Sequence, residues 1–137
     1  MISINRIDHI SQVLHGLNLN VGDDNVLRTC LKISLYSYCG KVDGDIACVW
    51  GLAPPTLLSD QAYLWLWHNS DLVDQHKFLF VRHSQLMMEQ MLKEFPTIVG
   101  HVKVGAEKSK RWLRWLGAEF SAGEGGMLRF KIRKSDG

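Results

Sequence analysis

The stretch Ala62-Tyr63-Leu64-Trp65-Leu66-Trp67 decides the fold class, because it is rich in β-forming residues and apolar at every position. A strand that is apolar on both faces belongs in a sheet that is covered on both sides. After it, we expect a polar loop over 68–75, a long helix over 77–95 and another strand over 98–104. A strand, a helix and a second strand in this order predict an α/β fold.

The last third of the chain predicts a short helix and two closing strands. The helix covers 107–116, and Gly117 stands where helices commonly end on a glycine. Strands are expected over 118–121 and 127–133, joined by the glycine-rich turn 123–126.

The first half predicts two helices and a hairpin. Apolar residues spaced by three and four predict a helix over 5–15, and a second helix runs from Asp24 or Asn25 to about residue 36. An Asp-Gly turn at 43–44 joins two apolar runs, 37–42 and 46–51, which is a strong hairpin pattern. Together these elements predict one domain, residues 1–137, with a single mixed central sheet of about six strands flanked by about four helices.

Composition excludes several classes of protein. The chain has 137 residues, a net charge of +2 and a sequence pI near 8.5, so it lacks the strongly basic character of a nucleic-acid-binding domain. The three cysteines, Cys30, Cys39 and Cys48, form neither a disulfide framework nor a zinc motif, and we expect mostly buried thiols. No apolar run approaches the length of a membrane span, and the N-terminus does not have the pattern of a signal peptide. We therefore expect a soluble intracellular protein with no nucleic-acid, membrane or metal ligand.

The order of elements resembles that of the GCN5-related N-acetyltransferases, the GNAT family. The segment from Ala106 to Ala118 is similar to the last helix of the family core and has its Leu116-Gly117 ending. The chain looks most like small GNAT-like proteins of T7-type podophages, which are often labelled acetyltransferase or internal virion protein A. Segments 27–34, 42–47, 49–54, 65–66 and 102–117 carry this likeness.

The resemblance implies acetyl-CoA as cofactor. The family holds the pyrophosphate with a glycine-rich loop at a helix N-terminus, where backbone N–H groups face the anion. The matching residues 71–78 contain no glycine, so side chains would replace some of those donors. The pantetheine arm would pair with the backbone near Leu66 and Trp67. The implied cofactor-binding residues are therefore Leu66, Trp67, Gln75, His76, Lys77, Arg82 and Lys108. The alternative is a polar loop and a helix start without a phosphate site, and a solvated helix face for Lys108 and its basic neighbours.

Two histidines are candidates for a general base that would deprotonate an amine. His68 ends the central strand and His101 lies on the next one, and histidine titrates in the suitable range. The alternative is that both are structural or merely exposed. The family's helix asparagine and tyrosine correspond to Ala106 and Leu113 here, and neither side chain can transfer a proton.

Two functions remain open from the sequence. The first is a phage-encoded acyltransferase that uses acetyl-CoA to acetylate an amine, on a host protein for example, in the host cytoplasm. The second is a catalytically degenerate GNAT-fold protein that binds and modulates a host bacterial protein or lies in the virion interior. Five tryptophans would surround the acyl-CoA position, where they either form part of the hydrophobic core or fill the cleft. They are Trp50, Trp65, Trp67, Trp112 and Trp115.

Overall fold

The predicted hairpin is present. In the computed structural model, which describes the chain except residues 1, 10, 15–22, 56–60, 69 and 135–137, strand β2 (Tyr36–Val42) pairs antiparallel with β3 (Asp45–Ala53). Asp43 and Gly44 both adopt positive φ, 50° and 89°, as a two-residue turn between twisted strands requires.

The N-terminal segment corrects one prediction. Residues Ile2–Arg6 form a strand, β1, that pairs antiparallel with β2, whereas we expected a helix over 5–15. Among the described residues of that range, Ser11–Leu14 are helical, as α1, and α2 follows over Asp23–Ile33. Isoleucines at positions 2 and 4 also fit the two-residue period of a strand, and the available partner β2 favours pairing over an isolated turn of helix.

The central part follows the expected order with one change. Strand β4 covers Ala62–His68 and the long helix α4 covers Lys77–Glu94. Between them lies a short helix, α3 (Ser70–Gln75), so the prediction of a loop at 68–75 was wrong. Strand β5 covers Thr97–Lys103.

The C-terminal elements agree with the expectation to within a residue or two. Helix α5 spans Glu107–Trp115 and ends before Gly117, whose φ is 97°. The closing strands β6 (Glu119–Ala122) and β7 (Met127–Arg133) pair antiparallel.

The strands form one sheet of seven in the order β1-β2-β3-β4-β5-β7-β6. The β4–β5 pair is parallel, whereas the pairs β1–β2, β2–β3, β5–β7 and β6–β7 are antiparallel. The mixed α/β architecture is therefore confirmed, and the seventh strand beyond the six expected is β1.

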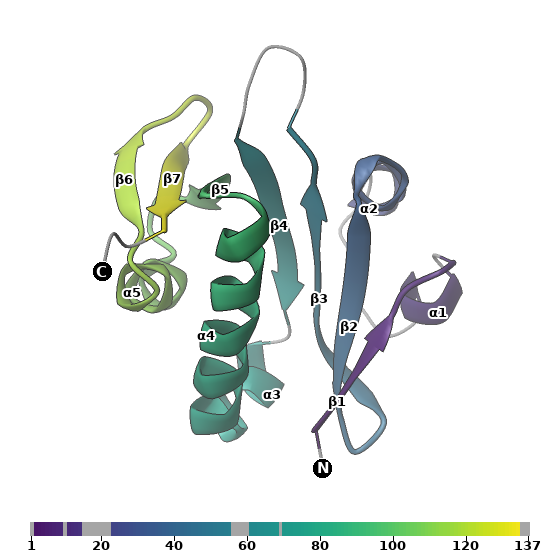
Figure 1. Cartoon of the computed structure of the whole chain (residues 1–137). Coiled ribbons are helices and arrows are strands. Elements are labelled where there is room, and N and C mark those ends of the chain that lie inside the picture. Colours follow the sequence, from purple (N-terminus) through teal and green to yellow (C-terminus); the bar gives the residue numbers. More distant parts are fainter. Residues whose placement is uncertain (1, 10, 15–22, 56–60, 69, 135–137) are drawn as a thin grey trace. The chain divides into compact units, whose positions relative to one another are not determined.

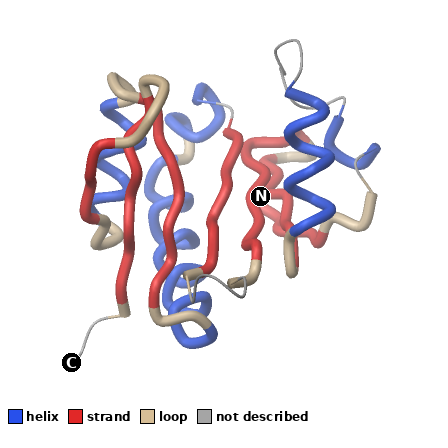
Figure 2. Tube along the Cα trace, turned by 90° about the horizontal axis from the view of Figure 1, so that it is seen from above, coloured by secondary structure: helices blue, strands red, loops and turns tan. Residues whose placement is uncertain are grey.

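The chain divides into two compact units, and each is described by itself. The first unit contains residues 1–54 and 64–77, and the second contains 55–63 and 78–137. In the first unit, helix α2 packs against β3 (Figure 1), and the most deeply buried side chains are Val13, Leu27, Val49 and Leu52. In the second unit, β5, β7 and β6 run side by side (Figure 2), and buried side chains include Met88, Met91, Ile98, Leu113, Phe130 and Ile132. The single domain expected from the sequence stays a prediction.

The cysteines are free thiols, as expected. Cys39 and Cys48 are buried and Cys30 is partly buried. Burial raises the pKa of the Cys48 thiol to about 12, so this group is protonated and unreactive at neutral pH. No helix among the described residues is both long and apolar enough to cross a membrane.

Candidate functional site

Strands β4 and β5 pair in parallel within the second unit, with Ala62 opposite Ile98 and Tyr63 opposite Val99. This register decides which side chains of the two strands lie on the same face of the sheet.

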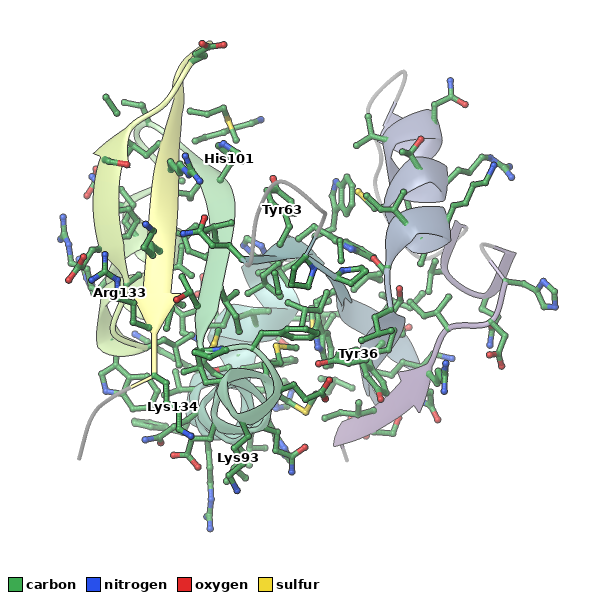
Figure 3. The ribbon with its side chains drawn as sticks, turned by 45° about the horizontal axis from the view of Figure 1, so that its top comes forward. Tyr36, Tyr63, Lys93, His101, Arg133 and Lys134 are labelled. Carbon is green, nitrogen blue, oxygen red and sulfur yellow. The ribbon has the colours of Figure 1, made fainter. Side chains whose placement is uncertain are left out.

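Tyr63 and His101 form a hydrogen-bonded pair within the second unit. The Tyr63 hydroxyl and Nδ1 of His101 lie 2.8 Å apart, and their rings are 5.6 Å apart between centroids. Both belong to the second unit, and Figure 3 labels them on adjacent strands. When Nδ1 carries the imidazole proton it donates to the phenol oxygen, which leaves the Nε2 lone pair free to accept a proton. This arrangement suits a general base.

The sequence analysis missed Tyr63. It selected His101 for its residue type, but the partner is 38 positions away and lies on another strand. Because β4 and β5 are parallel with Tyr63 opposite Val99, Tyr63 and His101 project from the same face. Only the strand register, which is not encoded in any local pattern, brings these two side chains together.

His68, the other candidate base, belongs to the first unit. It is the last residue of β4 and is exposed, yet nearby protein atoms partly desolvate its ring. This desolvation lowers the pKa of His68, and the charge of Asp74 acts in the opposite direction. A histidine with a lowered pKa is neutral at pH 7 and can accept a proton. His68 lies in the first unit and His101 in the second.

The expected phosphate-binding loop is replaced by helix. The N–H of His76 donates to the Val73 carbonyl at 3.2 Å, which occupies one of the backbone donors in this segment. Phe78, in the first turn of α4, stands where the family has a glycine, and its side chain is 89% exposed. This segment therefore does not present its backbone N–H groups to a phosphate in the way that a glycine-rich loop does.

The remaining cofactor-site candidates are spread over both units. Leu66 and Trp67 lie half-buried near the end of β4, Gln75 ends α3, His76 follows it, and Lys77 begins α4; all five belong to the first unit. Arg82 on α4 and Lys108 on α5 are exposed and belong to the second unit. Their roles stay predictions.

Helix α5 has no acid at the position of the family's tyrosine. Leu113 is 4% exposed and packs in the core of the second unit, and Ala106 precedes the helix without a side-chain cap. The neighbouring Trp112 donates its indole N–H to the Ser84 hydroxyl at 2.9 Å and so ties α5 to α4. This face of α5 has a structural role.

The tryptophans have different surroundings. Trp65 is buried in the first unit, where its indole N–H donates to the Ser34 hydroxyl at 2.6 Å. Its ring also covers Gly51, and Trp67 packs on it edge to face at 5.7 Å between centroids. Trp115, by contrast, is 53% exposed. Trp65 is therefore a core residue.

The described residues contain no group of three or more His, Cys, Asp or Glu side chains that could hold a metal ion. Comparison by sequence adds no assignment, since no protein-family model and no curated protein matches the chain.

Solved structures do match. A Bacillus subtilis acetyltransferase in complex with CoA has a TM-score of 0.70 at 11% identity, covering 98% of this chain and 100% of that one. The ribosomal-protein-S18-alanine N-acetyltransferase of Escherichia coli has a TM-score of 0.71 at 12% identity, covering 100% of this chain and 96% of that one. The GNAT domain of S. lividans PAT has a TM-score of 0.60 at 10% identity, covering 85% of this chain and 70% of that one. The chain has the fold of the GNAT acetyltransferases.

Proposed function

We propose that this chain is an N-acyltransferase that transfers an acetyl group from acetyl-CoA to an amine. The observation that carries the proposal is the hydrogen-bonded pair of Tyr63 and His101 in a chain with a GNAT fold. The pair supports it because a candidate base is held there by a residue of the neighbouring strand.

The residues present fit acetyl-CoA in part. Backbone groups of β4 at Leu66 and Trp67 would hydrogen-bond the amides of the pantetheine arm. The phosphates would depend on side chains, namely Gln75, His76, Lys77, Arg82 and Lys108, because α3 replaces the glycine-type loop. Cationic side chains bind phosphate well but are less preorganised than a backbone cradle. We therefore expect weaker CoA binding than a glycine-rich loop would give.

Acetyl-CoA would supply an activated acetyl thioester. The amine nitrogen would attack the carbonyl carbon, so that a C–N bond forms and the C–S bond breaks. Nε2 of His101 would take the amine proton, with Tyr63 holding the ring through Nδ1. The departing thiolate would be protonated by solvent, since Ala106 and Leu113 offer no acid. His68 is the second candidate for the base.

Thiol release from acetyl-CoA in the presence of a panel of amines tests the proposal. We expect turnover in the native chain and a loss of about a hundredfold or more in His101→Gln, the usual scale for general base catalysis. His9→Gln is the matched control, because His9 is exposed in the first unit. Absence of turnover with every amine, together with no thermal stabilisation by acetyl-CoA, would refute the proposal.

A second candidate function is a GNAT-fold binding module without catalysis. The helix α3 at the phosphate position and the buried Leu113 favour it. On this alternative, and in line with the likeness to podophage proteins, the chain would be phage-encoded and would bind a host bacterial protein or lie in the virion interior. Two measurements separate the host-binding role from the virion role. The tagged chain is expressed in the host and its complexes are isolated, and purified virions are analysed for the chain. A defined host complex indicates a modulator, whereas presence only in virions indicates an internal component.

A further inference from the structure

One face of the sheet in the second unit carries several exposed cationic side chains. In the ladder between β5 and β7, His101 lies opposite Arg129, Val99 opposite Lys131 and Thr97 opposite Arg133. Directly paired residues project from the same face of a sheet. His101, Lys103, Arg129, Lys131 and Arg133 therefore share one face, which we call the cationic face.

The opposite face of the same strands is the core. Ile98 pairs with Ile132, and Gly100 pairs with Phe130. The side chains of Ile98, Phe130 and Ile132 are at most 4% exposed. On the cationic face, by contrast, His101, Lys103, Arg129 and Arg133 are all exposed. Figure 3 shows His101 and Arg133 on these strands. No helix of the second unit buries the four side chains, so they are available to a partner.

The charge of this face is unbalanced. Four Lys and Arg residues stand against one carboxylate, Glu119 on β6, which lies opposite Lys131. The excess of three cations is larger than the +2 of the whole chain. Within the described residues, the side chains of Lys103, Lys131 and Arg133 form neither an ion pair nor a hydrogen bond, and Arg129 donates only to the neutral Gln61 at 3.3 Å. Like charges on adjacent strands repel one another, so a negative ligand would relieve this repulsion.

The spacing of the cations fits an extended polypeptide. Alternate residues of a strand are about 7 Å apart, so Arg129, Lys131 and Arg133 form a row with that repeat along β7. Carboxylates at alternate positions of an extended peptide have the same repeat. Cross-strand neighbours add a second row on β5, which contains His101 and Lys103.

We propose that the cationic face docks an acidic polypeptide segment. Resting on the proposed function, this segment would carry the acceptor amine toward His101, which belongs to the face. A single-stranded nucleic acid is less well matched, because such ligands stack on exposed aromatic rings. Among the described residues, the aromatic ring in contact with His101 is that of Tyr63, whose hydroxyl is engaged with it.

Fluorescence anisotropy with a labelled peptide in which Glu alternates with Ser tests the docking surface in the absence of acetyl-CoA. We expect binding that weakens with added salt and that falls about tenfold or more in the double variant Arg129→Glu/Arg133→Glu. The control Lys93→Glu/Arg111→Glu makes the same charge change at exposed positions of α4 and α5 and should bind like the native chain. The same peptide with Gln in place of Glu should not bind.

Three outcomes would overturn the inference: no binding of the glutamate peptide, equal losses in the two double variants, or tighter binding of an oligouridine than of the peptide. Turnover of a small uncharged amine is measured in the same variants. That reaction needs His101 but neither Arg129 nor Arg133, so its absence in the native chain contradicts the proposed function and leaves the docking result to stand or fall by itself.

Discussion

The hydroxyl of Tyr63 on β4 and Nδ1 of His101 on β5 lie 2.8 Å apart. This hydrogen bond restrains the orientation of the imidazole, and when Nδ1 carries the proton it leaves Nε2 free. The same histidine belongs to the cationic face of β5 and β7. Acid–base chemistry and recognition of an acidic partner would therefore meet at His101.

Replacing Tyr63 by Phe should change the tautomer of His101 without unfolding the protein. Without the phenol oxygen, Nδ1 loses its acceptor, so the population with the proton on Nε2 should grow. Nitrogen-15 chemical shifts of the imidazole measure this ratio, and acetyl transfer should fall about tenfold with an unchanged KM for acetyl-CoA. Identical nitrogen shifts in the native chain and the variant would show that Tyr63 does not position the ring.

Gly51→Ala should destabilise the first unit. A Cβ at this position would lie 2.7 Å from Nε1 of Trp65, and Trp65 is held in turn by its hydrogen bond to Ser34. Overpacking of this kind costs about 1–3 kcal/mol. Urea unfolding followed by tryptophan fluorescence measures the loss. Gly123→Ser is the control, because its added side chain would meet the backbone of the second unit. The fluorescence emission of Trp65 in this folded variant should therefore match that of the native chain. An unchanged midpoint in Gly51→Ala would contradict the packing described here.

The free energy of unfolding should decrease as the pH falls below about 6.5, in part because of His68. The folded chain lowers the pKa of His68 from its ordinary value of 6.5, so the unfolded chain binds more protons in the window below that value. Stability is therefore retained above this window and lost as the pH falls through the folded pKa. His68→Gln should flatten this dependence, whereas His9→Gln should not.

Asp74→Asn isolates the electrostatic part of this effect. The carboxylate of Asp74 favours the charged imidazole, so its removal should lower the pKa of His68 further. Proton NMR titration of the His68 ring reports the midpoint directly. A rise of the midpoint would contradict the assignment in which desolvation lowers the pKa of His68 and the Asp74 carboxylate raises it.

Leu113→Tyr should not create an active acid on α5. Because Leu113 is 4% exposed, a tyrosine there would place its hydroxyl in the core of the second unit. We expect a lower melting temperature, from overpacking and a buried polar group, and no gain in acetyl transfer. A gain in turnover with preserved stability would indicate that this side of α5 faces the reacting groups.

Most of the fold could be predicted from the sequence, because long periodic segments and the Asp43-Gly44 turn specify their own structure. The failures lie where a local pattern is ambiguous. Ile2 and Ile4 fit a strand as well as a helix, and only pairing with β2 decides between them. Residues 70–75 form a short, polar segment, so neither its hydrophobic period nor its composition indicated the helix α3.

The candidate site was less accessible to sequence reasoning. His101 was selected by residue type, but its partner Tyr63 and its cationic neighbours Arg129 and Lys131 depend on strand register. Leu113 was recognised as unable to transfer a proton, and its burial adds the reason why a hydrophobic residue suits that position. Geometry between distant strands is a tertiary property that no single segment contains.

The most direct test of the central claim is amide hydrogen exchange at Leu66, Trp67 and His68, measured with and without acetyl-CoA. The account predicts slower exchange at these β4 amides when acetyl-CoA is present, because the pantetheine arm would hydrogen-bond the backbone of β4 near Leu66 and Trp67. The same exchange rates in both samples would contradict the account.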